Sequence, residues 1–170
     1  MGPDLVRPAL EISGKRPLAQ PDGFTKWMRR QDRLAVGNLR KTIRLLKYLR
    51  DYKQTFTVPS VILTVIVGGR VSWWRSQLLA GYADLPTAFT RLVADTDRWL
   101  QDHPDLPEIS DPSCAEARFD HRLTQREYGN FRDRFHGYAQ RIHAAYSARD
   151  RQESITQWRR VFSDEFAPVP

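Results

Sequence analysis

The sequence TQREYGNFRDRFHGYAQRIHAAYSA, residues 124–148, carries the clearest periodic pattern in this 170-residue chain. Its large apolar side chains recur every three or four positions, the spacing that places them on one face of an α-helix. This apolar stripe consists of Tyr128, Phe131, Phe135, Tyr138, Ile142 and Ala145. A helix of this length with one apolar face must pack against other elements, which favours a bundle of helices.

Three other segments predict helices in the same way. Asp32–Tyr52 has an apolar stripe between strongly basic faces, and Leu85–Leu100 has a second stripe of similar spacing. Asp150 with Glu153 resembles a capped helix start and precedes a segment that carries Ile155, Trp158 and Phe162. Together with a fifth, uniformly apolar segment, they predict a mostly α fold, a compact bundle of about five helices.

The fifth segment, Pro59–Val67, is ambiguous on local grounds. Its β-branched residues favour a buried strand, whereas a proline at a first helical position suits a buried helix. Periodicity does not separate these alternatives in so short an apolar run.

The N-terminal residues do not show this helical pattern. Pro3, Pro8, Pro17 and Pro21 interrupt any long helix, so we expect an irregular arm over residues 1–30, with one short strand possible at Leu5–Ile12. The helical domain is expected to span residues 31–166, and the segment between Gln101 and Leu123 is expected to be a loop.

Composition limits the function classes. The chain has 27 Lys and Arg residues against 20 Asp and Glu, a net charge of +7, which favours polyanionic partners such as nucleotides or nucleic acid. The single Cys114 excludes an internal disulfide and a cysteine-based zinc site. The longest apolar run is about half the ~20 residues that cross a bilayer, and the first residues lack a secretion signal pattern. We therefore expect a cytoplasmic protein without a membrane partner.

Catalytic and metal-binding motifs are scarce. The chain has no glycine-rich phosphate loop and no nucleophile elbow. Asp95 and Asp97 form the only Asp-x-Asp pair, but inside a helix two such side chains diverge, so we expect a solvated face. His136 and His143 are seven residues apart and are expected to be ordinary histidines. No metal site is predicted.

The segments around residues 44–51 and 59–60 contain the remaining candidate residues for a binding site. Lys47 lies on the most basic helix, and Ser60 stands at the start of the next apolar segment. A lysine ammonium, a serine hydroxyl and the N–H groups of a helix N-terminus can together bind phosphate. Arg44 and Arg50 are the supporting basic residues. The plainer alternative is a solvated basic face next to a serine helix cap.

Thr42–Asp51 followed by Pro59–Val67 resembles the spine and the following helix of the cyclic-oligonucleotide synthases. These nucleotidyltransferases are the bacterial relatives of cyclic GMP-AMP synthase and oligoadenylate synthase. The resemblance continues in Ile109–Pro112 and in Trp158–Ser163 with Phe166, which are similar to the C-terminal end of that family. Pro8-Ala9 and Trp27 resemble the linker that leaves its catalytic sheet.

The resemblance implies a helical lobe that closes one wall of a nucleotide cleft, in an enzyme making cyclic or linear oligonucleotide second messengers for antiviral (anti-phage) defence. It implies that Lys47 contacts the polyphosphate of an ATP- or GTP-type nucleotide, that Ser60 joins it there, and that Pro59–Val67 is helical. The family's Gly-Ser and Asp-x-Asp motifs are missing. Asp4 would match the third carboxylate, although Arg7 adds one residue to the family's spacing. We therefore expect a truncated or split enzyme, inactive alone, whose Mg²⁺ ions are held by a complementary catalytic half.

Two other readings stay open. Arg and Lys residues interleaved with aromatic residues can bind nucleic acid, and Trp73-Trp74 between Arg70 and Arg75 is a candidate stacking patch. Alternatively, an apolar helix face serves to dock a protein partner.

Overall fold

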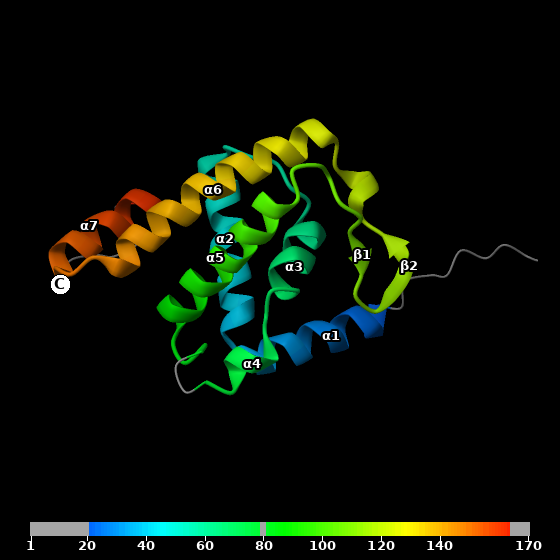
Figure 1. Ribbon diagram of the computed structural model, residues 1–170, viewed down its shortest axis with the longest axis horizontal. Coiled ribbons are helices and arrows are strands. Elements are labelled where there is room, and N and C mark those ends of the chain that lie inside the picture. Colours follow the sequence, from blue (N-terminus) through cyan, green and yellow to red (C-terminus); the bar gives the residue numbers. More distant parts are fainter. Residues whose placement is uncertain (1–20, 79–80, 164–170) are drawn as a thin grey trace, which may run out of the picture.

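The computed structural model describes residues 21–78 and 81–163, which form seven α-helices and one small two-stranded sheet (Figure 1). The mostly α fold expected from the sequence is confirmed. The helices are α1 (Pro21–Leu34), α2 (Asn38–Lys53), α3 (Ser60–Gly68), α4 (Trp73–Ser76), α5 (Leu85–Asp102), α6 (Gln125–Ser147) and α7 (Arg151–Val161). The strands are β1 (Ser110–Asp111) and β2 (Cys114–Arg118), followed by a 3₁₀ turn at Asp120–Arg122.

The helices surround one apolar core. α5 packs against both α2 and α6, and α7 folds back along the end of α6. α3 lies against α2 and α5, while α1 crosses the base of the bundle in contact with α2 and α3 (Figure 1). This arrangement brings the C-terminal end of α2 to the N-terminal end of α3, which is the connection that carries the candidate site.

α6 forms as the sequence pattern predicts. All six residues of the apolar stripe are buried, and Thr124 caps the helix through a reciprocal pair of hydrogen bonds with Glu127. α6 is 23 residues long but amphipathic, and no helix in the described part of the chain is long and apolar enough to cross a membrane.

α3 is a helix although its residues favour a strand. Ile62, Leu63, Ile66 and Val67 are all nearly completely buried, so the helix is covered on several sides by its neighbours. The Thr64 hydroxyl donates to the carbonyl oxygen of residue 60 at 2.7 Å, which satisfies this polar group inside the core. The helix implied by the family resemblance is confirmed, because tertiary burial outweighs a weak local preference for strand.

The N-terminal expectations need two corrections. Helix α1 begins at Pro21, so residues 21–30 are not irregular; a proline is well tolerated in the first turn of a helix. The helix expected over Asp32–Tyr52 is instead two helices, because Val36 and Gly37 adopt positive φ angles of 53° and 77° and turn the chain. The strand expected at Leu5–Ile12 lies outside the described residues.

The segment expected as a loop between Gln101 and Leu123 contains a short hairpin. β1 and β2 pair antiparallel, and Arg118 holds the hairpin to the turn after it. Its Nε and Nη2 atoms donate to the two carboxylate oxygens of Asp120 at 3.0 and 2.7 Å. Asp120 also accepts the backbone N–H of Ile109 at 3.1 Å. These bonds lower the pKa of Asp120 to about 2, mainly through Arg118.

Asp120 should make stability depend on acid pH. Because its pKa is lower in the folded than in the unfolded chain, its contribution is complete above pH ~4 and is lost as pH falls toward ~2. We expect Asp120→Asn to lower the free energy of unfolding by about 0.5–1 kcal/mol near neutral pH, because Arg118 is partly exposed to solvent. Urea denaturation at neutral pH and at pH ~2.5 measures this, with Asp105→Asn as an exposed control. Equal losses in both variants would contradict the assignment.

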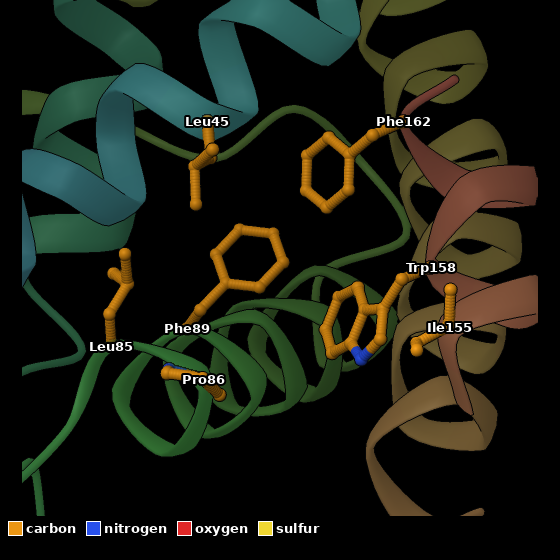
Figure 2. A pocket seen from close by; sticks show the side chains of 7 residues that line it. All are labelled: Leu45, Leu85, Pro86, Phe89, Ile155, Trp158 and Phe162. Atoms are coloured by element: carbon orange, nitrogen blue, oxygen red, sulfur yellow. The ribbon is translucent and has the colours of Figure 1, made fainter. Parts of the chain in front are cut away.

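An apolar hollow of about 230 Å³ lies where α2, α5 and α7 meet (Figure 2). Phe89 of α5, Trp158 of α7 and Phe162, the residue after α7, point into it, and their ring centres are within 6.2 Å of one another. These aromatic contacts join the C-terminal end of α7 to α5, in addition to the packing of α7 along α6.

Candidate phosphate-binding site

The end of α2 and the start of α3 are joined by Arg50. Its Nη1 donates to the carbonyl oxygen of Val58 at 2.8 Å and to the hydroxyl oxygen of Ser60 at 3.1 Å. On its other side the guanidinium is paired with Asp51, with Nε–Oδ1 at 2.7 Å and Nη2–Oδ2 at 3.3 Å. The structure therefore brings together Arg50 and Ser60, two of the residues selected from the sequence.

Ser60 is exposed and occupies the first position of α3. Since its oxygen accepts the bond from Arg50, its own hydroxyl proton remains available to donate to a ligand. Pro59 is the N-cap, and no described side chain caps this helix end. The first N–H groups of α3 and its positive dipole end thus lie beside the serine hydroxyl, an arrangement suited to an anion.

Lys47 lies one helical turn before Arg50 and Asp51 on α2. It is half-buried, and within the described residues its ammonium makes no hydrogen bond or ion pair. The pKa of Asp51 is lowered mainly by its hydrogen bonds from Arg50 and further by the nearby charge of Lys47. Lys47 therefore lies within electrostatic reach of Asp51, the partner of Arg50.

The three basic residues of the candidate site differ in what they can do. Arg50 is engaged with Asp51, Val58 and Ser60, so it positions the connection. Lys47 is the cation that stays available for phosphate. Arg44, exposed one turn earlier on the same face, adds positive potential but lies farther from α3.

Two open hollows flank this connection. One, of about 590 Å³, is lined by Arg50, Asp51 and the segment 54–58. The other, of about 490 Å³, lies between the end of α2 and α7 and is lined by Tyr52, Lys53, Thr156, Arg159, Arg160 and Ser163. This second, more basic hollow was not predicted from the sequence. The signal was the Arg159-Arg160 pair, but only the fold brings it next to α2.

The solvated helix face expected for the Asp95 and Asp97 pair is wrong. Both carboxylates form ion pairs or hydrogen bonds that link α5 to neighbouring helices. Asp95 pairs with Arg75 at 2.6 Å and with Arg98 at 3.2 Å. The Oδ2 of Asp97 is 2.9 Å from Nδ1 of His136, which links α5 to α6. Asp4, the candidate carboxylate from the sequence, lies outside the described residues. Within the described residues, no group of three His, Cys, Asp or Glu side chains is placed to hold a metal ion.

Comparison with known proteins gives a match at the level of structure. No protein-family model matches the chain, and no curated protein matches it in sequence. Among solved structures, CdnC of E. coli MS115-1 with ATP matches with a TM-score of 0.60 and 19% identity, over 84% of this chain and 50% of CdnC. The complex of the same CdnC with HORMA-deltaN matches with a TM-score of 0.61, 18% identity and the same coverage. The fold of this chain is thus similar to that of about half of CdnC.

Proposed function

We propose that this chain is the nucleotide-contacting helical lobe of a nucleotidyltransferase that makes cyclic or linear oligonucleotide second messengers in antiviral (anti-phage) defence. The observation that carries the proposal is the connection between α2 and α3, where Arg50 donates to the Ser60 hydroxyl oxygen at 3.1 Å, one helical turn after Lys47 on α2. The fold likeness to CdnC, a bacterial cyclic-oligonucleotide synthase with a solved structure that includes ATP, supports it.

In this proposal the triphosphate of an ATP- or GTP-type nucleotide lies across the start of α3. The ammonium of Lys47 binds phosphate oxygens as a point charge, and the Ser60 hydroxyl and the first N–H groups of α3 donate hydrogen bonds to them. Arg50 fixes the distance between the two helices and prevents Asp51 from repelling the phosphates, because it pairs with that carboxylate.

The catalytic chemistry is assigned to another part of the enzyme. The described residues hold no cluster of carboxylates that fits Mg²⁺, so the metal ligands are expected in that other part. The chain covers half of CdnC, which leaves room in such an enzyme for a complementary catalytic half that would hold Mg²⁺. The isolated chain is expected to bind nucleotide without transferring it.

Nucleotide binding can be tested on the chain itself. We expect ATP to bind weakly, with a Kd of about a millimolar. Lys47→Ala should lower the affinity for ATP about tenfold, because a charge-assisted contact with phosphate is lost. The measurement is isothermal titration or NMR titration of backbone signals, which should shift at residues 60–62. The matched control is Lys41→Ala, which removes a lysine from another face of α2.

Ser60→Ala should lower the affinity for ATP by a smaller factor, about threefold, because a neutral hydrogen-bond donor contributes less than a charged one. Equal losses from Lys41→Ala and Lys47→Ala would mean a diffuse attraction of polyanions, and the phosphate site would have to be abandoned.

One observation favours nucleic-acid binding as a second candidate function. Trp73 and Trp74 of α4 are 54% and 76% exposed, and such rings can stack against bases. Salt-dependent binding of single-stranded RNA that ATP does not displace, and that Trp74→Ala weakens, would support this alternative.

A further inference from the structure

A hollow of about 240 Å³ lies at the opposite end of α3 from Ser60. α3 has nine residues, so about 14 Å of helix separates this end from the candidate phosphate site. Most of its wall is apolar or aromatic and comes from four parts of the chain: α1, α3, α5 and the hairpin. The residues of this hollow are Trp27, Val65, Ile66, Gly69, Arg70, Trp99, Glu108, Ile109, Ser110 and Pro112.

Arg70 is the one cation among the residues of this wall. Its guanidinium carbon lies over the ring of Trp99, 5.0 Å from the ring centre, which is a cation–π contact. Its Nε is buried without a hydrogen-bond acceptor, and within the described residues the guanidinium forms no ion pair. Burial lowers the pKa of Arg70, and the more distant charge of Asp95 only partly opposes this effect.

The neighbouring carboxylates are already engaged. Asp95 is bonded to Arg75 at 2.6 Å and to Arg98 at 3.2 Å. Glu108, at the rim of the hollow, is paired with Arg118 at 2.7 Å. An incoming anion therefore meets one unpaired guanidinium, while the nearest carboxylate at the rim is neutralised by its own partner. A buried donor without an acceptor is uncommon in folded proteins and is costly unless a ligand or water satisfies it.

The aromatic wall is fixed by close packing. Trp27 approaches α3 so closely that a Cβ on Gly68 would lie 2.6 Å from its ring. The Nε2 of Gln31, one turn later on α1, donates to the carbonyl oxygen of Gly68 at 3.0 Å. The ring of His103 stacks on Trp99 with centres 4.4 Å apart. Both tryptophans are therefore held in place before a ligand enters.

We propose that this hollow binds a small aromatic carboxylate, whose ring contacts the apolar wall and whose carboxylate accepts hydrogen bonds from Arg70. A planar guanidinium fork matches the two oxygens of a carboxylate. The volume suits a single ring, because drug-sized ligands occupy pockets of roughly 300 Å³ or more. A polyphosphate does not fit this chemistry, because one cation in an apolar wall cannot balance several charges.

Benzoate and benzamide test the proposal on the unmodified chain, because they share a ring and differ in charge. We expect benzoate to shift the indole N–H signals of Trp27 and Trp99 in NMR titrations, with a Kd of about a millimolar. Benzamide should bind at least about tenfold more weakly, because it cannot form the charge-assisted hydrogen bonds. Equal affinity for both compounds, or shifts that spare both indoles, would overturn the proposal.

Arg70→Met tests the cation while it keeps an apolar side chain of similar length. We expect benzoate affinity to fall at least about tenfold, whereas Arg98→Gln, which removes an exposed guanidinium next to Trp99 in sequence, should leave it within about twofold. If Arg70→Met fails to fold, Arg70→Lys replaces it, with an expected loss of about threefold because the flat fork is absent. Unchanged binding in whichever Arg70 variant folds would reject the site.

This site is independent of the proposed nucleotide function. ATP should not displace benzoate, and Lys47→Ala should leave benzoate binding unchanged. Failure of the phosphate site therefore appears only in the ATP titration, and failure of this second site appears only with benzoate.

Discussion

Phe131→Ala should lower the free energy of unfolding by about 3–5 kcal/mol, the largest loss we expect from one substitution in this chain. Phe131 is completely buried in the middle of the apolar stripe of α6. Its ring lies 5.4 Å from Phe56, in the connection between α2 and α3, and 5.6 Å from Phe135. Removing the ring leaves a cavity between α6 and this connection that the surrounding packed side chains cannot easily fill. Because domains of this size are typically stable by about 5–15 kcal/mol, the variant should be partly unfolded at moderate temperature.

Urea denaturation followed by circular dichroism measures this effect. Trp74→Ala is the matched control, because it also deletes a large aromatic ring but from a side chain that is 76% exposed. That control should change the free energy of unfolding by about 0.5 kcal/mol or less. A loss below about 1 kcal/mol in Phe131→Ala would mean that α6 does not form the centre of the core.

The sequence predicts best those parts of the fold in which the helical spacing of apolar residues continues over many residues. α6 has six apolar positions in register over about five turns, and all six are buried. The break between α1 and α2 was missed because the apolar spacing continues through Val36 and Gly37. Gly37 is a usable signal, but Val36 at a φ of 53° adopts a conformation that its side chain disfavours. Backbone hydrogen bonds from Val36 to Arg33 and from Gly37 to Asp32 close this turn, and the spacing of apolar residues does not show them.

Short elements depend on contacts that sequence patterns do not contain. The strand propensity of residues 60–67 is overruled by burial between α2 and α5, and only the family resemblance pointed to a helix. The hairpin at residues 110–118 is too short to show an alternating pattern. It is held by the ion pairs of Arg118 with Glu108 and Asp120, which lie on opposite sides of it in sequence.

The candidate site was predictable in its residue types but not in their roles. Lys47 and Ser60 could be chosen from the sequence, because a basic helix followed by a serine-led helix suits phosphate. The tethering role of Arg50 depends on the approach of two helix ends, which no spacing along the chain specifies. Arg70 was noticed only as a neighbour of Trp73-Trp74. The structure instead places it against Trp99, 29 residues away in sequence.

The second large expected effect comes from a substitution at the C-terminal end of α3. Gly68→Ala should lower the free energy of unfolding by about 1–2 kcal/mol, because the new methyl group would lie 2.6 Å from the Trp27 ring. The ring cannot move freely, since Phe24 packs against it at 5.5 Å and Gln31 fixes α1 to the same residue of α3. The clash therefore exceeds the gain of up to about 1 kcal/mol that alanine normally brings to a helix.

Gly129→Ala is the matched control, because a Cβ at that position of α6 meets no atom within 4 Å. It should stabilise the protein by about 0.5–1 kcal/mol, so the two glycine substitutions should differ by about 2 kcal/mol in denaturation experiments. Gly68→Ala should also shift the indole signal of Trp27 and weaken benzoate binding, while ATP affinity stays within about twofold. If ATP binding fell together with benzoate binding, the two ends of α3 would act as one site, and the phosphate contact would extend to Arg70.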